Sequence, residues 1–364
     1  MRKRFGRRAG VALIAGICYV VSFWISVEFL THAAVEKINP VKIRASNSAA
    51  VTMLAFGDIN LGRAVGQKIL HGDVDYPFRN IRWLTDSVDI VFANLECQLS
   101  DQHGETQDPK HNLIFTGPPE GALSLAHFGI TVVSTANNHA FDYGVKALFE
   151  TIDNLDSEHI AHSGTGKTDS LLYEPLLFVK KGIRFALFAV TDVMNFSKGW
   201  QRYVAEADTA NLFPAVRRVK SSVDVVIVSY HGGDEYAVRP SLRTRQFAAA
   251  CLQQGVQLFL GHHPHVPYGV TKIEDGKGTR YIVYSLGNFV FSQPQYYWTQ
   301  HSIAVRIQFE KSDSMVYLHS FECIPLNASM QPSVATDSTT IAGIVHRVQS
   351  LSNTTISFVK DQIH

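Results

Sequence analysis

The chain has 364 residues, of which 46% are hydrophobic and 18% charged, and its formal net charge is +1. A charge so close to zero argues against a general nucleic-acid-binding surface, which needs an excess of Lys and Arg. The four cysteines (Cys18, Cys97, Cys251 and Cys323) form no CxxC pair, which argues against a cysteine zinc site and a disulfide framework. One pairing among the last three stays open if they face an oxidising compartment.

The N-terminus predicts a membrane anchor. Residues 1–8 are rich in Lys and Arg, and residues 9–27 then run without a charge, close to the ~20 residues that a spanning helix needs. We expect a cytoplasmic flank at 1–8, a single transmembrane helix at 9–30 and a stem at 31–50, with the remaining chain outside the cytoplasmic membrane. The alternative is a cleaved signal peptide, whose apolar region is usually shorter, about 7–15 residues.

From residue 51 onward, short apolar runs alternate with helical stretches. Several runs are apolar throughout, as expected for strands buried on both faces, and helices are expected at 144–156 and 241–254. The alternation favours an α/β fold with layered sheets. The apolar runs are residues 51–56, 88–92, 130–134, 184–190, 223–229, 256–260 and 281–284.

The last part of the chain changes in composition. From residue 326 it is rich in Ser, Thr and Asn, with one possible short helix at 339–351. We therefore expect one main domain at 51–325, followed by a C-terminal tail at 326–364.

Residues able to bind metals follow nearly every expected strand. Because ligands of open α/β sheets bind at the carboxyl ends of the strands, we expect these groups to converge on one crevice. Carboxylates, amides and imidazoles together are the donors of a dinuclear hydrolytic centre, whose metals lie about 3.5–4 Å apart. In chain order the residues are Asp58, Glu96, Asn138 with His139, His231, the run His262-His263-Pro264-His265, and Asn288.

Each of these motifs has a structural alternative. A single histidine after a strand is more often a hydrogen-bonded structural residue, Asp58 could cap a helix, and Asn138 could form a turn. Three imidazoles within four residues have little structural purpose, however, and favour metal binding. The occurrence of such motifs at several strand ends favours the metal centre over the separate structural roles.

Taken in order, these motifs resemble the CapA family of capsule biosynthesis proteins. That family is associated with poly-γ-glutamate synthesis and export and belongs to the calcineurin-like metallophosphatase superfamily. The resemblance covers about residues 51–291. It is carried by Gly57-Asp58 with Gly62-Arg63, Asn94-Leu95-Glu96, Ala136-Asn137-Asn138-His139 with Asp142-Tyr143-Gly144, His231 with Gly233 and Glu235-Tyr236, Gly261-His262-His263-Pro264-His265-Val266, and Tyr284-Ser285-Leu286-Gly287-Asn288-Phe289.

The resemblance implies a four-layer α/β/β/α sandwich and a centre of two divalent ions, with Mn, Fe or Zn as the candidates. By motif position, Asp58 and His265 would hold the first metal, while Asn138, His231 and His263 would hold the second and Glu96 would bridge them. His139 would be the general acid, oriented by Asp142. Arg63 and Glu235 would contact the substrate.

Three positions depart from the wider metallophosphatase pattern. Asn60 stands where a histidine is usual, Ala140 replaces the acid that commonly follows the catalytic histidine, and Glu96 replaces a bridging aspartate. Since a neutral amide is a poorer ligand than an imidazole for a transition metal, the first site should be weaker or prefer a harder ion such as manganese.

These features predict a membrane-anchored capsule or poly-γ-glutamate biosynthesis or export protein that acts on an anionic polymer or ester outside the cytoplasmic membrane. Its partners would be the anionic capsule polymer or phosphoester and the membrane synthase or export subunits, with no nucleic acid. Two alternatives stay open. One is a cell-surface metal-dependent phosphoesterase unrelated to capsule, and the other is a non-catalytic scaffold subunit of a membrane synthase or export complex. A metal-dependent hydrolase is the enzymatic interpretation.

Overall fold

The computed structural model describes residues 50–276, 278–312 and 315–359. The chain divides into the units Met1–Lys42 and Ile43–His364, and every described residue belongs to the second unit. The predicted anchor at 9–30 and nearly all of the stem at 31–50 lie outside the described residues. Within the described ranges, no helix combines the length and apolarity needed to cross a membrane.

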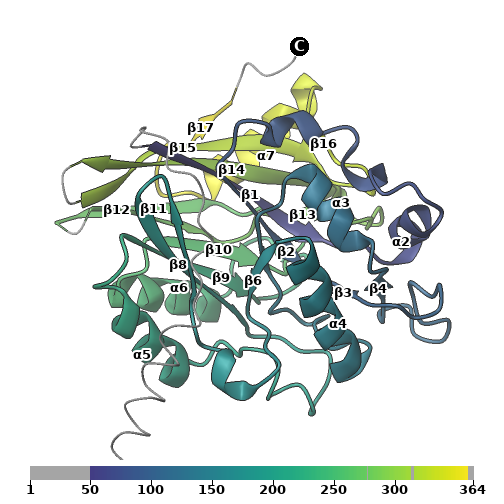
Figure 1. The fold of residues 1–364 in the computed structure, drawn as a ribbon. Coiled ribbons are helices and arrows are strands. Elements are labelled where there is room, and N and C mark those ends of the chain that lie inside the picture. The colour runs from purple at the N-terminus through teal and green to yellow at the C-terminus, as the bar shows by residue number, and fades with distance from the viewer. Residues whose placement is uncertain (1–49, 277, 313–314, 360–364) are drawn as a thin grey trace, which may run out of the picture. The chain divides into compact units, whose positions relative to one another are not determined.

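Two large β-sheets form the body of this unit (Figure 1). The first has the strand order β16-β15-β14-β1-β2-β5-β6, with β13 pairing with β1 and β17 with β15. Its strands are β1 (Ala50–Ile59), β2 (Ile90–Leu95), β5 (Val132–Ser134), β6 (Ala161–Ser163), β13 (Asn288–Val290), β14 (His301–Ser312), β15 (Met315–Asn327), β16 (Ser333–Val334) and β17 (Ser357–Phe358).

The second sheet has the strand order β11-β12-β10-β9-β8-β7, and its four central strands are parallel. Its strands are β7 (Leu176–Lys180), β8 (Ile183–Thr191), β9 (Val225–His231), β10 (Leu258–His262), β11 (Val270–Asp275) and β12 (Gly278–Val283). A separate pair consists of β3 (Gln98–Leu99) and β4 (Thr116–Gly117).

Helices pack on the outer faces of the two sheets and at their edges. The α-helices are α2 (Arg63–Leu70), α3 (Gly121–Phe128), α4 (Gly144–Ser157), α5 (Thr209–Val219), α6 (Leu242–Gln254) and α7 (Ser338–Ser350). The 3-10 helices are η1 (Tyr76–Phe78), η2 (Arg82–Thr85), η3 (Asp169–Leu171) and η4 (Tyr297–Gln300).

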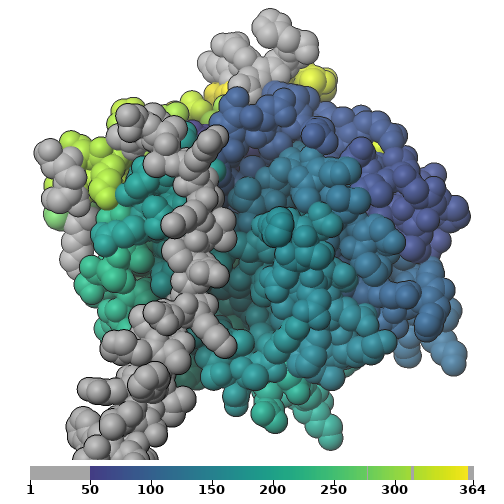
Figure 2. Space-filling model, in the orientation of Figure 1, coloured from purple at the N-terminus to yellow at the C-terminus, as the bar shows by residue number. Residues whose placement is uncertain are grey.

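The apolar residues fall into three clusters that define the layers. One lies between the sheets and includes Phe92 of the first and Leu187 of the second. Another packs the outer face of the first sheet against α2 and α3, and the third packs the outer face of the second sheet against α5 and α6. In the space-filling view, the purple, blue and teal residues from the first half of the described chain lie together on one face (Figure 2). The expected mixed α/β fold with layered sheets is confirmed.

The strands predicted from apolar runs are present, with ends shifted by a few residues: the runs overlap β1, β2, β5, β8, β9, β10 and β12. Residues 326–359, separated above as a tail, contribute β16, α7 and β17 to the same unit, and Ile344 and Val348 of α7 enter the core between the sheets. The cysteines Cys97, Cys251 and Cys323 are buried and free.

Candidate metal centre

The carboxyl ends of strands from both sheets meet at one place. In the first sheet Asp58 of β1 lies opposite Asn94 of β2, and it also pairs with Asn288 of β13. In the second sheet His231 and His262, the last residues of β9 and β10, are neighbours in register. Parallel pairing thus brings polar residues that are far apart in sequence to adjacent strand ends. This agrees with the expectation that ligands of α/β sheets bind at the carboxyl ends of strands.

Glycine is required at position 57, where β1 closely approaches the turn before β13. The backbone of β1 lies so near the turn before β13 that a Cβ at Gly57 would collide with the carbonyl oxygen of Gly287. The Asp58 amide donates to that same carbonyl, at 3.0 Å. A larger residue at 57 would therefore push apart the two strand ends that flank Asp58.

Glu96 lies at the centre of the site. It follows β2 directly, its side chain is fully buried, and neither carboxylate oxygen has a hydrogen-bond partner among the described residues. Its Oε1 lies 3.8 Å from His231 Nε2 and 3.7 Å from His265 Nε2. Burial raises the pKa of Glu96 well above its usual range, and the nearby Asp58 charge adds to the rise. A buried carboxylate without donors is costly, and a bound cation would satisfy it.

Asp58 is in a different electrostatic environment. Its Oδ1 accepts a hydrogen bond from Asn94 Nδ2 at 2.9 Å and lies 3.2 Å from His262 Nδ1, while its Oδ2 lies 3.5 Å from His265 Nδ1. Burial alone would raise the pKa of Asp58, but the bonds and charges of His262 and His265 hold it well below its usual range. The pKa values of the two buried carboxylates are therefore shifted in opposite directions.

Two of the imidazoles around these carboxylates, His231 and His263, are buried and have lowered pKa values. His231 Nε2 lies 2.8 Å from Asn138 Oδ1, and the rings of His231 and His263 are 4.8 Å apart. Burial lowers the pKa of His231 well below its ordinary value, and burial together with nearby His265 lowers the pKa of His263 to about 3. Neutral imidazole is the form that ligates metals.

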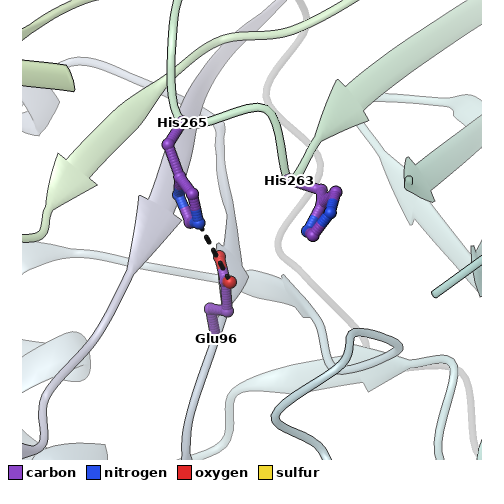
Figure 3. A group of neighbouring side chains, drawn as sticks. All are labelled: Glu96, His263 and His265. Atoms are coloured by element: carbon purple, nitrogen blue, oxygen red, sulfur yellow. Dashed lines mark ion pairs between the residues drawn. The ribbon is translucent and has the colours of Figure 1, made fainter. Parts of the chain in front are cut away.

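The donor atoms form two overlapping groups. Glu96, His263 and His265 offer ligand atoms within 4.8 Å of one another, and so do Asp58, Glu96 and His231. The side chains of the first group point toward a common space, with His265 and Glu96 directly facing each other (Figure 3). Because Glu96 belongs to both groups, the residues present fit a centre of two cations that share one carboxylate.

Of the seven non-glycine residues with positive φ in the described ranges, four lie at or beside this site. Positive φ angles are found at His263 (91°) and His265 (59°), and also at Arg63 (53°) and Tyr236 (59°). Residues other than glycine adopt this region at a cost of about 1–3 kcal/mol, and such strain clusters at functional sites. The Tyr236 amide donates to the carbonyl of Pro264, between the two strained histidines, at 3.0 Å.

His139 and Asp142 form a buried pair beside the carboxylates. His139 Nδ1 lies 2.8 Å from Asp142 Oδ2, which also accepts from the Phe115 amide at 3.0 Å. Ala140, where the wider pattern has an acid, is buried in the core between the sheets, where a carboxylate would be costly. Asp142 supplies the acid from two residues further along.

The residues predicted to contact substrate differ in exposure. The Arg63 guanidinium lies 4.5 Å above the Phe115 ring, which stacks on His139 at 4.1 Å, and Arg63 Nη2 donates to the Asn112 carbonyl at 2.8 Å. Glu235 is exposed. Burial raises the pKa of the neighbouring Tyr236, and the Glu235 charge adds to that rise.

Asn60 uses its side chain locally, because its Oδ1 accepts a hydrogen bond from the Gly62 amide at 2.8 Å. Two residues that the sequence analysis did not select lie at the site. Asn195 accepts from Asn138 Nδ2 at 3.1 Å, and its own Nδ2 lies 3.4 Å from His139 Nδ1. Asn94 joins Asp58 to His231, whose Nδ1 is 3.2 Å from Asn94 Nδ2. Asn94 stood within a quoted motif, whereas Asn195 has no motif that could have identified it.

Comparison with known proteins gives consistent matches. A family model described as "Bacterial capsule synthesis protein PGA_cap" matches residues 52–293. The chain is 29% identical over 306 residues to "Capsule biosynthesis protein CapA" of Bacillus anthracis, which covers 80% of this chain and 70% of that protein. It is 30% identical over 279 residues to "PGA biosynthesis protein CapA" of Bacillus subtilis (strain 168), covering 75% of this chain and 71% of that protein.

Among solved structures, the chain is similar to the calcineurin-like phosphoesterase YfkN from Bacillus subtilis. The identity is 13%, the match covers 83% of this chain and 97% of that one, and the TM-score is 0.44. The family assignment rests on the sequence matches, which span the strand-end motifs from Asp58 to Asn288. The chain belongs to the bacterial capsule synthesis protein family PGA_cap, as its resemblance to CapA proteins predicted.

Proposed function

We propose that this protein is a membrane-anchored component of capsule or poly-γ-glutamate biosynthesis or export, with a metallophosphatase-like centre that acts on an anionic polymer or its ester outside the cytoplasmic membrane. The observation that carries the catalytic part is Glu96, a fully buried carboxylate without hydrogen-bond partners between two imidazoles. Such a group is typical of a bridging ligand to two cations.

By motif position the chain's own residues would divide between two ions, and this division differs from the two spatial groups described above, which join His263 with His265 and Asp58 with His231. Asp58 and His265 would hold the first, Glu96 would bridge, and Asn138, His231 and His263 would hold the second. A pair of divalent cations supplies Lewis-acid polarisation of a phosphoryl or carbonyl oxygen and lowers the pKa of a water. Mn, Fe and Zn are all compatible with a donor set of imidazoles and oxygens.

His139 is the proton donor in this proposal. Asp142 lies against Nδ1 of His139 and orients the ring, so that Nε2 is the atom that exchanges a proton with the leaving group. Arg63 lies over the ring of Phe115, on which His139 also stacks, and its charge would attract an anionic substrate group.

The biological context comes from the relatives. The two Bacillus proteins are described as capsule and PGA biosynthesis proteins, and a relative in Mycobacterium tuberculosis, 24% identical over 295 residues, as a probable polyglutamine synthesis accessory protein. The basic flank and the uncharged segment at 9–27 support an anchor that leaves the metal centre outside the cytoplasmic membrane.

The proposal is tested with the full-length chain expressed in a capsule-producing host that lacks its own copy. We expect wild type to restore surface polymer and His231→Ala to fail, because His231 is a fully buried donor at the centre. His319→Ala is the matched control. The side chain of this histidine is 58% exposed, and it forms an ion pair with Glu310.

Each alternative function gives a different result. Restoration of polymer by His231→Ala, with no metal in the purified wild-type chain, would favour the scaffold. Phosphoester turnover that needs metal and His139, in a protein without effect on surface polymer, would favour a phosphoesterase unrelated to capsule.

A further inference from the structure

The first metal position lacks the ligand that a metallophosphatase pattern expects. The Asn60 amide oxygen accepts from Gly62 N at 2.8 Å and so closes a local turn. Asp58 therefore has to be held in place by other groups. Asn94 Nδ2 approaches its Oδ1 at 2.9 Å, and a second group beside Oδ1 comes from the other sheet.

That second group is His262. It is the last residue of β10, in register with His231 of β9, and adjacent residues of parallel strands point to the same face of a sheet. Leu258 and Leu260 of the same strand lie in the core between the sheets, so strand alternation directs His262 to that face as well. Its side chain is fully buried, and Nδ1 lies 3.2 Å from Asp58 Oδ1.

A purely structural role explains His262 poorly. Neither ring nitrogen has an aligned hydrogen-bond partner among the described residues, and the nearest ring is Phe92, with centroids 5.9 Å apart. A buried polar group without partners costs about 1–3 kcal/mol, which an apolar residue at this core position would avoid. The close approach to Asp58 is the feature that an apolar residue could not provide.

We infer that His262 is a positioning residue of the metal centre, whose Nδ1, 3.2 Å from Asp58 Oδ1, holds that carboxylate in the orientation that binds the first cation. This inference rests on the proposed metal centre. Partners that orient a ligating side chain are typically worth 10–100-fold in metal affinity. With Asn60 engaged by Gly62, the first site has Asp58, His265 and the bridging Glu96 as its ligands, so the orientation of the Asp58 carboxylate affects its affinity.

The test measures Mn²⁺ binding to the full-length chain in detergent by titration calorimetry and by electron paramagnetic resonance of the unbound ion. We expect wild type to bind two ions. His262→Phe, which keeps a ring of similar size, should weaken the first site about 10–100-fold and leave the second within about 2-fold. Asn60→Ala should weaken the first site less than His262→Phe does.

A matched pair of polar variants separates positioning from packing. In His262→Asn the amide nitrogen takes the place of Nδ1, whereas in His262→Gln it takes the place of Nε2. We expect Asn to retain the affinity of the first site and Gln to lose it, with equal thermal unfolding midpoints in chelator. This pair keeps the inference testable if His262→Phe does not fold.

The possible failures are distinguishable. If wild type binds two ions and both His262→Phe and His262→Gln keep the affinity of the first site, the positioning role is overturned and the proposed metal centre stands. A stronger loss in Asn60→Ala than in His262→Phe would also overturn it, because Asn60 would then be the ligand. If wild type binds no Mn²⁺, Zn²⁺ or Fe²⁺, both the proposed centre and this inference are overturned.

Discussion

The two buried carboxylates of this protein respond oppositely to the same interior. Asp58 has an amide donor and two nearby imidazoles, and its pKa is held well below the usual range. Glu96 has no donor, so burial and the Asp58 charge raise its pKa well above that range. The folded protein without metal therefore stores an unfavourable electrostatic interaction at Glu96, which a cation would relieve.

This difference predicts how Glu96→Gln changes stability with pH. A carboxyl group whose folded pKa is raised contributes stability that is present below its unfolded pKa, about 4.3, and lost as pH rises through the folded pKa. Glutamine does not titrate, so the Glu96→Gln variant does not lose stability in this way as the pH rises. In chelator at pH 8, Glu96→Gln should therefore raise the free energy of unfolding by about 1–3 kcal/mol, and near pH 4 the difference should disappear.

The measurement is urea unfolding of both proteins between pH 4 and 8 in chelator. Glu120→Gln is the control, since this residue is exposed and stands at the start of α3. Parallel stability curves for wild type and Glu96→Gln would contradict the electrostatic account.

At this scale the sequence identifies candidate ligands more readily than the residues that would orient them. Asp58, Glu96 and His231 could be identified because each follows an apolar run, and such local patterns are readable. The relation of His262 to Asp58 depends on how β10 of one sheet faces β1 of the other. Asn195 lies on a loop after β8 and reaches Asn138 only through the fold.

At the scale of elements, the central parallel strands were predictable and the long antiparallel hairpin was not. β8, β9 and β10 are apolar runs buried along nearly their whole length, which is a strong signal. β15 alternates exposed and buried residues over its first half, and its sequence mixes charged and apolar types. Its partner β14 also pairs with β1, although the paired residues, such as Val51 and Phe309, are separated by more than half of the sequence. No local pattern encodes that pairing.

Helix α7 overlaps the short helix expected at 339–351, within the region 326–364 that composition set apart from the main domain. Polar residues dominate this region, but Asp337 caps the helix by accepting from the Thr340 amide at 2.7 Å, and Ile344 and Val348 are completely buried. Ile344→Ala should therefore lower the free energy of unfolding by about 2–5 kcal/mol, because it leaves a cavity in the core between the sheets.

Chemical denaturation of the full-length chain measures this effect, with His346→Ala as the control on the exposed face of the same helix. The control should stay within about 0.5 kcal/mol of wild type. Equal stabilities for Ile344→Ala and the control would mean that α7 is a dispensable tail.

At the scale of the whole described unit, the candidate metal centre lies where the two sheets meet. Asp58 lies in β1 and Glu96 follows β2 of the first sheet, whereas His231 ends β9 and the His263–His265 turn follows β10 of the second. Cations bound there would be coordinated by side chains from both sheets. Separating the sheets would therefore break metal–ligand bonds. Metal binding and the packing of the two sheets should therefore be thermodynamically linked.

The linkage predicts the size of the effect. A ligand that binds only the folded state at 100 times its Kd adds about 2.7 kcal/mol of stability per site, so Mn²⁺ should raise the thermal midpoint of the full-length chain and chelator should reverse the rise. His231→Ala should remove much of the Mn²⁺-induced shift, whereas His319→Ala should keep all of it, because His319 is on the surface. Scanning calorimetry with and without Mn²⁺ measures both shifts. A wild-type midpoint that does not respond to Mn²⁺, Zn²⁺ or Fe²⁺ would show that the two sheets are not joined through cations.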